Sequence, residues 1–313
     1  MNTQDNSPIK KSVIVNIFTS YGRYLQDVKQ LCSETISKRI YYLKRLLVAL
    51  DISQDCDLIK LITTESIATF ILDFGENHGP GSFLDMGTCI RSFLRYCHLN
   101  KILDRDFSAL IQTVHRWQLA NTPKAVSDEN ISQLLNSIDG TSAIDLRDKA
   151  IITLLSVYGV RGVHLRRLCL KDLDWNEAII HFPSTKNGPP IDQPITTEAG
   201  NCLSEYLLKG RPQCSFNEVF LTVKCPVHPM TDSRTCSNII RRRFKQTRIK
   251  LAEGVSYGTH GFRHAFATRL VGRIPFLELS KMLGHSSPNS TLLYSKVAFS
   301  MLREASMPWP EEA

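Results

Sequence analysis

The chain has 313 residues, of which 42% are hydrophobic and 22% charged, and its 38 lysines and arginines outnumber its 30 aspartates and glutamates to give a net charge of +8. The length suits two globular domains, because single cores rarely grow much beyond roughly 250 residues, and the basic excess favours nucleic acid as a partner, with an anionic membrane surface as the alternative. The sequence has no run of about 18 apolar residues, so no membrane span is predicted. The N-terminus is polar, so no signal peptide is predicted either, and we expect a cytoplasmic protein.

The first part of the chain predicts a small helical domain over residues 13–118, after a flexible tail at 1–12. Apolar residues recur at three-to-four spacing from Ser33, again over about 65–73, and again over 83–97, and a fourth helix is expected at about 105–118. A cluster of glycine and proline at 75–81 is expected to end the second helix. The candidate phosphate-binding residues of this domain, which could equally form solvated helix faces, are Lys38, Arg45, Arg91 and Arg95.

A linker is predicted at residues 119–126, where Pro123 disfavours helix in the residue before it. A second domain over 127–306 begins with Ser127, a good helix N-cap. A strongly apolar helix then covers 150–158, and another begins near Leu165. Short strands are expected at 173–181 and 191–195, joined by a hairpin turn at Asn187-Gly188.

A basic helix follows at 237–252 and carries Arg241, Arg242 and Arg243, which either contact phosphates or form a solvated face. The remainder of the domain, 261–306, is expected to be helical with breaks at Pro275, Gly284 and Pro288, before a C-terminal tail at 307–313. The predicted fold class is therefore mainly α with a small β-sheet.

The nine cysteines predict neither a disulfide framework nor a metal site. They are scattered, odd in number and without a CxxC pair. Cys225 and His228 form a CxxH near Cys214 and Cys236, but half a spacing motif is a weak sign of zinc. We expect reduced thiols, no metal ion and no cofactor.

Two local patterns carry the chemistry of the second domain. The first is Thr259-His260-Gly261-Phe262-Arg263-His264, and the second is Leu283-Gly284-His285, followed nine residues after the histidine by Tyr294. One helical turn separates His260 from Arg263, so both lie on the same face and can hold one cluster of anionic oxygens.

These residues resemble the tyrosine recombinase (phage integrase) family. The family has an early arginine, a hairpin lysine, a His-x-x-Arg step, a later histidine and a tyrosine nucleophile. The matching residues, in chain order, are Arg161, Lys186, His260, Arg263, His285 and Tyr294.

The resemblance extends over about residues 125–300. The helical N-terminal domain matches the family's core-binding domain only in size and helix count. Two features depart from the family pattern: His164 replaces an acid three residues after the early arginine, and the hairpin is rich in proline, Gly188-Pro189-Pro190.

The resemblance implies a metal- and ATP-independent DNA strand transferase. Tyr294 would attack a phosphate and form a covalent 3′-phosphotyrosine, while Arg161 and Arg263 hold the non-bridging oxygens, since the guanidinium fork donates two parallel hydrogen bonds. Lys186 would protonate the leaving 5′ oxygen. His260 would assist proton movement around the tyrosine, and His285 would donate to a phosphate oxygen. A phenol has a pKa of about 10, and the two arginines would favour its phenolate form.

The implied partner is double-stranded DNA, on which a homo- or hetero-oligomer, expected to be a tetramer, assembles at the nucleoid. DNA integration, excision and transposition by a mobile element, and chromosome-dimer resolution, all use this chemistry. The apolar tail around Trp309 would dock on a neighbouring subunit or fold back on its own domain. The alternatives are a type IB topoisomerase and a non-catalytic DNA-binding accessory subunit.

Overall fold

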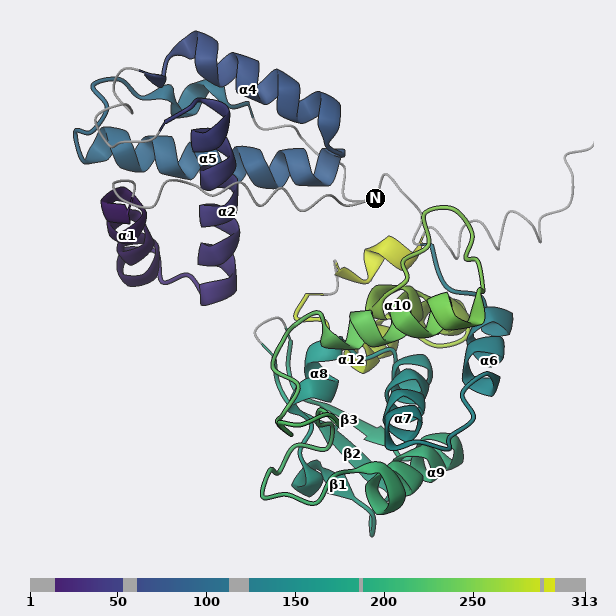
Figure 1. Cartoon of the computed structure of the whole chain (residues 1–313). Coiled ribbons are helices and arrows are strands. Elements are labelled where there is room, and N and C mark those ends of the chain that lie inside the picture. The colour runs from purple at the N-terminus through teal and green to yellow at the C-terminus, as the bar shows by residue number, and fades with distance from the viewer. Residues whose placement is uncertain (1–14, 53–60, 113–123, 186–187, 288–289, 296–313) are drawn as a thin grey trace, which may run out of the picture. The chain divides into compact units, whose positions relative to one another are not determined.

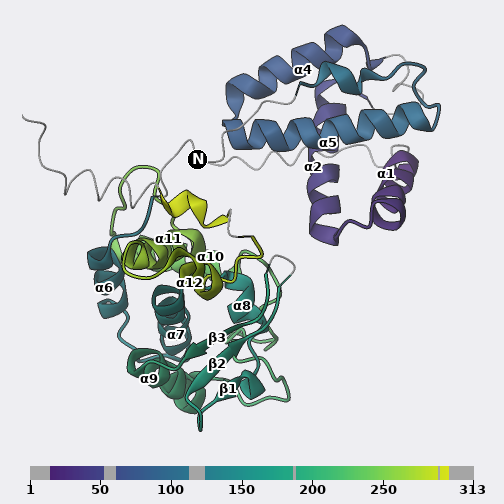
Figure 2. The same cartoon turned by 180° about the vertical axis from the view of Figure 1, so that it is seen from behind.

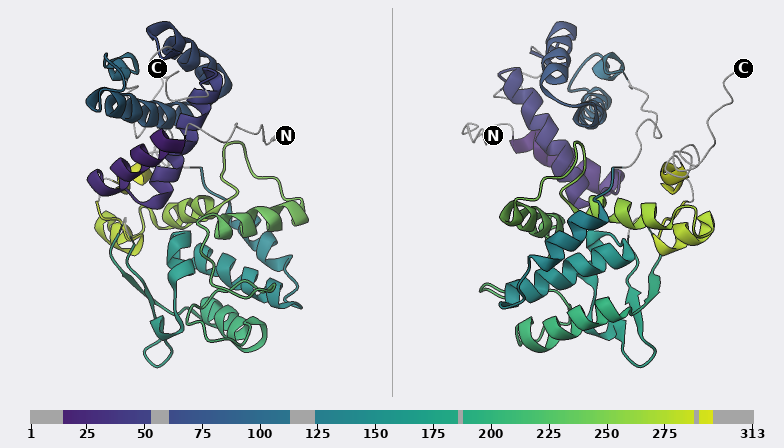
Figure 3. Two further views of the ribbon diagram at one scale, coloured as in Figure 1. Left: turned by 60° about the vertical axis from the view of Figure 1, so that its left-hand side comes forward. Right: turned by 90° about the vertical axis from the view of Figure 1, so that its right-hand side faces the viewer.

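A computed structural model describes residues 15–52, 61–112, 124–185, 188–287 and 290–295. The chain divides into two compact units, Met1–Arg116 and Trp117–Ala313, each with its own hydrophobic core (Figure 1). Helices dominate both units and the strands are few and short in every view (Figures 2 and 3), which confirms the predicted mainly α fold with a small sheet. The predicted tails at 1–12 and 307–313 and the linker residues 119–123 lie outside the described residues.

The first unit is entirely helical over its described residues. Its elements are α1 (Val15–Arg23), the π-helical η1 (Tyr24–Val28), α2 (Ser33–Ala49), α4 (Thr64–Asn77), α5 (Pro80–Leu99) and the 3-10 helix η2 (Phe107–Leu110). Tyr21, Leu46 and Phe93 are fully buried in its core.

Two boundaries in this unit differ from the sequence prediction. The helix expected to end at Asp73 continues through Gly75, which packs against the Phe83 ring of α5, and the break is limited to the residues before Pro80. Proline is well placed at the first turn of α5, because its missing N–H has no partner there in any case. The helix expected at 105–118 is described as far as residue 112, and this part forms the short 3-10 helix η2 in place of an α-helix.

The second unit surrounds the apolar helix α7. Its elements are α6 (Asp128–Asn136), α7 (Ala143–Tyr158), α8 (Gly162–Arg167), η3 (Leu170–Asp172), β1 (Leu173–Asp174), β2 (Ile179–Phe182), β3 (Ile191–Pro194), α9 (Thr197–Glu205), η4 (Tyr206–Gly210), α10 (Thr235–Thr247), α11 (Thr259–Leu270), α12 (Phe276–Met282) and η6 (Leu292–Tyr294). Ser127 caps α6 as predicted, its hydroxyl accepting from the Asn130 amide. Helix α10 ends before the predicted 252, because Arg248 adopts a left-handed conformation with φ 58°.

The sheet is antiparallel in the order β1-β2-β3. Ile180 pairs with Gln193 and Phe182 with Ile191. Ile180 and Phe182 are fully buried, while His181 between them faces outward. The alternation places one face of the sheet on the core, as expected for a half-buried strand.

The turn that ends α7 brings the chain back against α11. Gly159 has φ 58°, and a Cβ at this position would lie 2.5 Å from the Phe266 ring. Only glycine combines this backbone conformation with so close an approach, so the chain can turn sharply into α8. No helix in the described part of the chain is long and apolar enough to cross a membrane.

Candidate active site

Four segments of the second unit supply the candidate catalytic residues. Arg161 stands at the N-terminal end of α8, and α11 carries His260 and Arg263. His285 follows the left-handed Gly284 after α12, and Tyr294 ends η6.

The two arginines are held by backbone carbonyls. Arg263 is 4% exposed and donates from Nη1 to the Gly159 oxygen at 2.9 Å and from Nη2 to the Leu283 oxygen at 2.7 Å. Arg161 donates from Nη1 to the Gly284 oxygen at 2.9 Å. Burial, with a smaller contribution from Arg161, lowers the pKa of Arg263 to about 10, so it remains charged at neutral pH. We call Arg161 and Arg263 together the arginine clamp.

His164 supports the first member of the clamp. Its Nδ1 accepts the backbone N–H of Arg161 at 3.2 Å, and the residue is fully buried. Burial, followed by the charges of Arg161 and Arg263, lowers its pKa to about 4. A neutral histidine therefore stands where the family commonly has an acid, and its ring nitrogen gives the backbone N–H of Arg161 a hydrogen-bond partner.

Gly188, between β2 and β3, lies against the clamp. Thr185 and Gly188 pair with each other across the turn, and a Cβ on Gly188 would lie 2.2 Å from the Gly284 oxygen and 3.3 Å from Nη1 of Arg161. Lys186 itself lies outside the described residues, so its role stays a prediction.

Tyr294 is buried beside the clamp, with 2% of its surface exposed. It packs in a small apolar cluster with Phe266, Leu279 and Leu283, and its Oη lies 2.9 Å from Nδ1 of His264. Burial raises the pKa of the phenol, and Arg263 and Arg161 lower it by a smaller amount. The arginines thus act in the expected direction, but the net shift favours the neutral phenol.

The two predicted histidines have different surroundings. His260 is exposed in part, one helical turn from His264, and partial burial, followed by the charges of Arg263 and Arg161, lowers its pKa. His285 is half-buried with Nδ1 2.6 Å from the Thr291 hydroxyl, and burial lowers its pKa to about 4. Both rings are neutral at pH 7.

The sequence motifs do not identify His264, the residue that contacts the Tyr294 hydroxyl. His264 is part of the Thr259–His264 pattern but received no role there, and proton movement around Tyr294 was assigned to His260. The sequence does contain a signal, since His264 lies four residues after His260 and therefore on the same face of α11.

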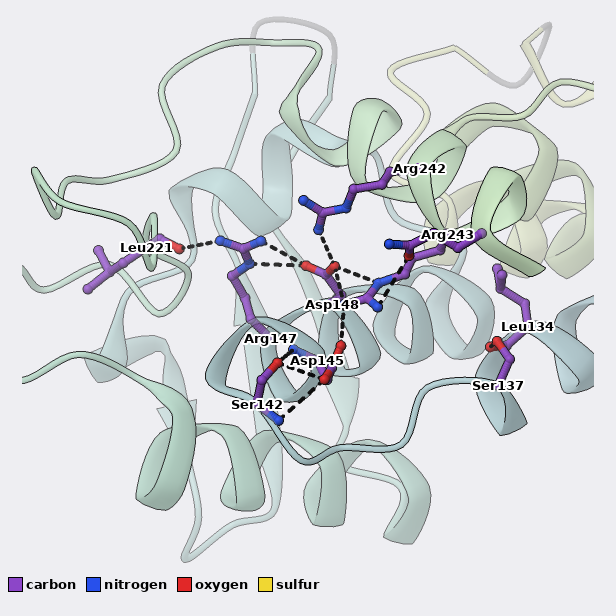
Figure 4. Close-up of polar contacts among 10 residues, drawn as sticks. Leu134, Ser137, Ser142, Asp145, Arg147, Asp148, Leu221, Arg242 and Arg243 are labelled. Carbon is purple, nitrogen blue, oxygen red and sulfur yellow. Dashed lines mark hydrogen bonds and ion pairs between the residues drawn. The ribbon is translucent and has the colours of Figure 1, made fainter. Parts of the chain in front are cut away.

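The three arginines of α10 are not equivalent, and two of them, Arg242 and Arg243, point toward α7 (Figure 4). Arg241 is exposed, whereas Arg242, with its side chain 45% exposed, and the buried Arg243 both pair with Asp148, a fully buried carboxylate of α7. Arg243 also pairs with Asp145 at 2.7 Å. Burial and two carboxylate partners argue against the predicted phosphate contact for Arg243, because its guanidinium already joins α10 to α7.

The basic candidates of the first unit are all at least partly exposed. Lys38 pairs with Asp85, and Arg45 bonds Nε2 of His78 and lies over the Phe74 ring. Arg91 donates to the Ile111 carbonyl at 3.0 Å, and the exposed Arg95 lies one turn further along α5. The two α5 arginines line a surface pocket of about 490 Å³ together with Asp106, Ser108, Ala109, Ile111 and Gln112.

The CxxH segment gives no metal-binding geometry. Cys214 and Cys225 are exposed and Cys236 is buried in the core. Across the described ranges no three His, Cys, Asp or Glu side chains gather as a set of metal ligands.

Residues 124–301 match the model of the phage integrase family. "Putative integrase/recombinase y4rA" of Sinorhizobium fredii is 33% identical over 72% of this chain and 54% of its own length, and y4rF of the same organism is 33% identical over 71% and 52%. The chain therefore spans about half the length of these two relatives. "Tyrosine recombinase XerD" of Pasteurella multocida is 28% identical over 94% of this chain and 97% of its own.

Solved structures share the fold at low identity. A lambda integrase dimer bound to a COC′ core site has a TM-score of 0.69 at 14% identity, covering 96% of this chain and 80% of that one. XerH site-specific recombinase bound to palindromic difH has a TM-score of 0.67 at 16% identity, covering 96% and 91%. At these identities the likeness establishes the fold.

Proposed function

Because the chain belongs to the phage integrase family, as its residues indicated, we propose that it is a tyrosine-type site-specific recombinase, which cuts and rejoins DNA strands through a covalent 3′-phosphotyrosine. The observation that carries the proposal is the arginine clamp beside Tyr294. Two guanidinium groups, fixed by three backbone carbonyls from the segments that follow α7 and α12, lie near one buried phenol.

The clamp suits a phosphoryl group whose negative charge grows as the tyrosine oxygen bonds to phosphorus. Arg161 and Arg263 keep N–H groups beyond those given to the carbonyls, and these would bind the non-bridging oxygens. Because the carbonyls hold the arginines before DNA arrives, little reorganisation is needed when the charge develops. Each such donor contributes about 2.7–4 kcal/mol to lowering the barrier, or roughly 10²–10³ in rate.

The remaining groups handle protons. As Tyr294 Oη bonds to phosphorus it loses its proton, and as the P–O5′ bond breaks the leaving oxygen gains one. Lys186, two residues before the Gly188 that lies against the clamp, is the proposed donor to that oxygen. His285 would donate to a phosphate oxygen, and His260, whose neutral ring lies one helical turn from His264, is the proposed acceptor of the proton that Tyr294 loses. The phosphotyrosine keeps the phosphodiester energy, so rejoining to a second strand needs no external energy source.

The proposed partner is double-stranded DNA, held by both units. Side chains that remain available for phosphate contacts are Lys38, Arg45, Arg91, Arg95, Arg241 and Arg242. XerH and lambda integrase are described as bound to their DNA sites, the latter as a dimer, which supports assembly of an oligomer, proposed to be a tetramer, on DNA. The integrase/recombinase relatives support a mobile-element role, and we propose action in the cytoplasm at the nucleoid.

The proposal is tested by incubating the protein with fragments of its own genomic DNA and trapping SDS-stable protein–DNA adducts. We expect adducts whose DNA ends map to a defined site, and none with Tyr294→Phe. An accessory DNA-binding subunit would shift the same fragments without forming adducts. A topoisomerase would relax supercoils without exchanging strands between two sites, so a two-site exchange assay separates it from a recombinase.

A further inference from the structure

His264 is the histidine of α11 that reaches the candidate nucleophile. Its Nδ1 lies 2.9 Å from Tyr294 Oη, and the two ring centroids are 5.6 Å apart. It follows Arg263 directly in the chain, so one helical segment supplies both a clamp arginine and the contact to the phenol.

The protonation state of His264 decides what this contact can do. Burial, then the neighbouring His260 and Arg263, lower its pKa to about 4, so the ring is neutral near pH 7. A neutral imidazole has one acceptor nitrogen, and a protonated phenol is a good donor. When the phenol donates to Nδ1, the oxygen's lone pairs remain free to approach phosphorus.

The same values argue against His264 as the base that removes the proton. Burial raises the pKa of Tyr294 from its usual 10.0, while the pKa of His264 is about 4. General-base catalysis is efficient when the pKa of the base lies near the operating pH, and the pKa of His264 lies well below it. Orientation does not need such a match. The contact can fix the phenol among apolar neighbours that could not otherwise hold its hydroxyl.

We propose that His264 is a positioning residue, which holds the Tyr294 hydroxyl by a hydrogen bond to Nδ1 and so aims it at the phosphate in the arginine clamp. This inference rests on the proposed function. It assigns to His264 a role that neither the family resemblance nor the motif spacing gave it.

The first test needs no DNA. Long-range ¹H–¹⁵N spectra of the full-length protein report which imidazole nitrogen accepts a hydrogen bond. We expect the Nδ1 resonance of His264 to move toward that of an unbonded acceptor nitrogen in Tyr294→Phe, which lacks the hydroxyl, while the exposed His181 stays unchanged. An unchanged His264 resonance would overturn the contact.

The second test measures the rate of adduct formation on the genomic fragments. His264→Leu removes the acceptor, and a misplaced nucleophile is expected to slow adduct formation on the order of 100-fold. His264→Asn keeps a polar group near the Nδ1 position and should recover most of the rate if the role is positioning. His181→Asn, at an exposed histidine of β2, is the matched control and should equal the parent protein.

The outcomes separate the two proposals. If His264→Leu forms adducts at the parent rate, the positioning role is overturned and the proposed function stands. If His264→Asn is as slow as His264→Leu, the positioning role is also overturned, the imidazole is assigned a proton-transfer role, and the proposed function again stands. Failure of the parent protein to form any adduct overturns both. Unchanged thermal unfolding and DNA affinity of the variants show that slow adduct formation does not come from misfolding.

Discussion

Replacing Asp148 should destabilise the second unit more than replacing any exposed acid. Its carboxylate is fully buried and accepts hydrogen bonds from Arg147, Arg242 and Arg243, of which Arg147 and Arg243 have side chains only 9% and 11% exposed (Figure 4). Asp148→Ala leaves these guanidinium groups crowded without their shared counter-charge. Breaking a buried ion pair by removing one partner typically costs about 3–5 kcal/mol.

The assay can report on this unit alone. Trp175 lies in the described part of the second unit, directly after β1, so its fluorescence follows the unfolding of that unit. For a domain of this size each kcal/mol shifts Tm by about 2–4 °C, which gives a decrease of roughly 6–20 °C for Asp148→Ala.

The matched control is Asp192→Ala. Asp192 forms an ion pair with His181 in which its side chain is 67% exposed, and exposed pairs contribute about 0–1 kcal/mol. If Asp148→Ala unfolded within about 1 °C of this control, the buried network would not be what holds α10 to α7, and the structural role given to Arg243 would be wrong.

Three further predictions follow from the site. Gly188→Ala should lower adduct formation at least tenfold without loss of DNA binding, because its Cβ would displace the Gly284 carbonyl that anchors the clamp, whereas Gly22→Ala, with open space around it, should not. The urea midpoint of unfolding should fall as pH drops from about 6.5 toward 4, because His164 is protonated in the unfolded chain over this range but stays neutral in the folded protein, where its pKa is about 4. The midpoint of a His164→Asn variant should depend less on pH. Arg241→Ala should weaken DNA binding at all sequences and reduce the slope of log affinity against log salt by about one, and an unchanged slope would remove Arg241 from the interface.

The local elements were predictable where a single physical cause decides them. Ser127 caps α6 as expected, and the apolar stretch predicted to be helical over 150–158 lies within the longer α7. The segment expected as one strand over 173–181 forms β1 and β2 with a turn between them, and β3 lies within the segment expected at 191–195. Boundaries failed where tertiary contacts outweigh local preference. Helix α4 continues through Gly75, which packs on Phe83. Helix α10 ends at Arg248, which adopts a left-handed conformation that is uncommon for arginine.

The candidate site was predictable as a set of residue types but not as a set of contacts. Motif order pointed to Arg161, Arg263 and Tyr294, and the structure brings them together. Pattern alone could not tell which of two histidines one turn apart faces the phenol, since both share a face of α11 and the answer depends on where Tyr294 packs. Similarly, three adjacent arginines look alike in sequence, and only the buried Asp148 reveals that Arg243 points inward.

The central claim is that Tyr294 bonds to DNA, and mass spectrometry of the trapped adduct tests it most directly. Cleavage after Lys281 and Lys296 releases residues 282–296, a peptide in which Tyr294 is the one tyrosine. After nuclease digestion we predict a nucleotide joined through its 3′ phosphate to this peptide at Tyr294. A nucleotide on any other residue, or an adduct that persists in Tyr294→Phe, would contradict the account.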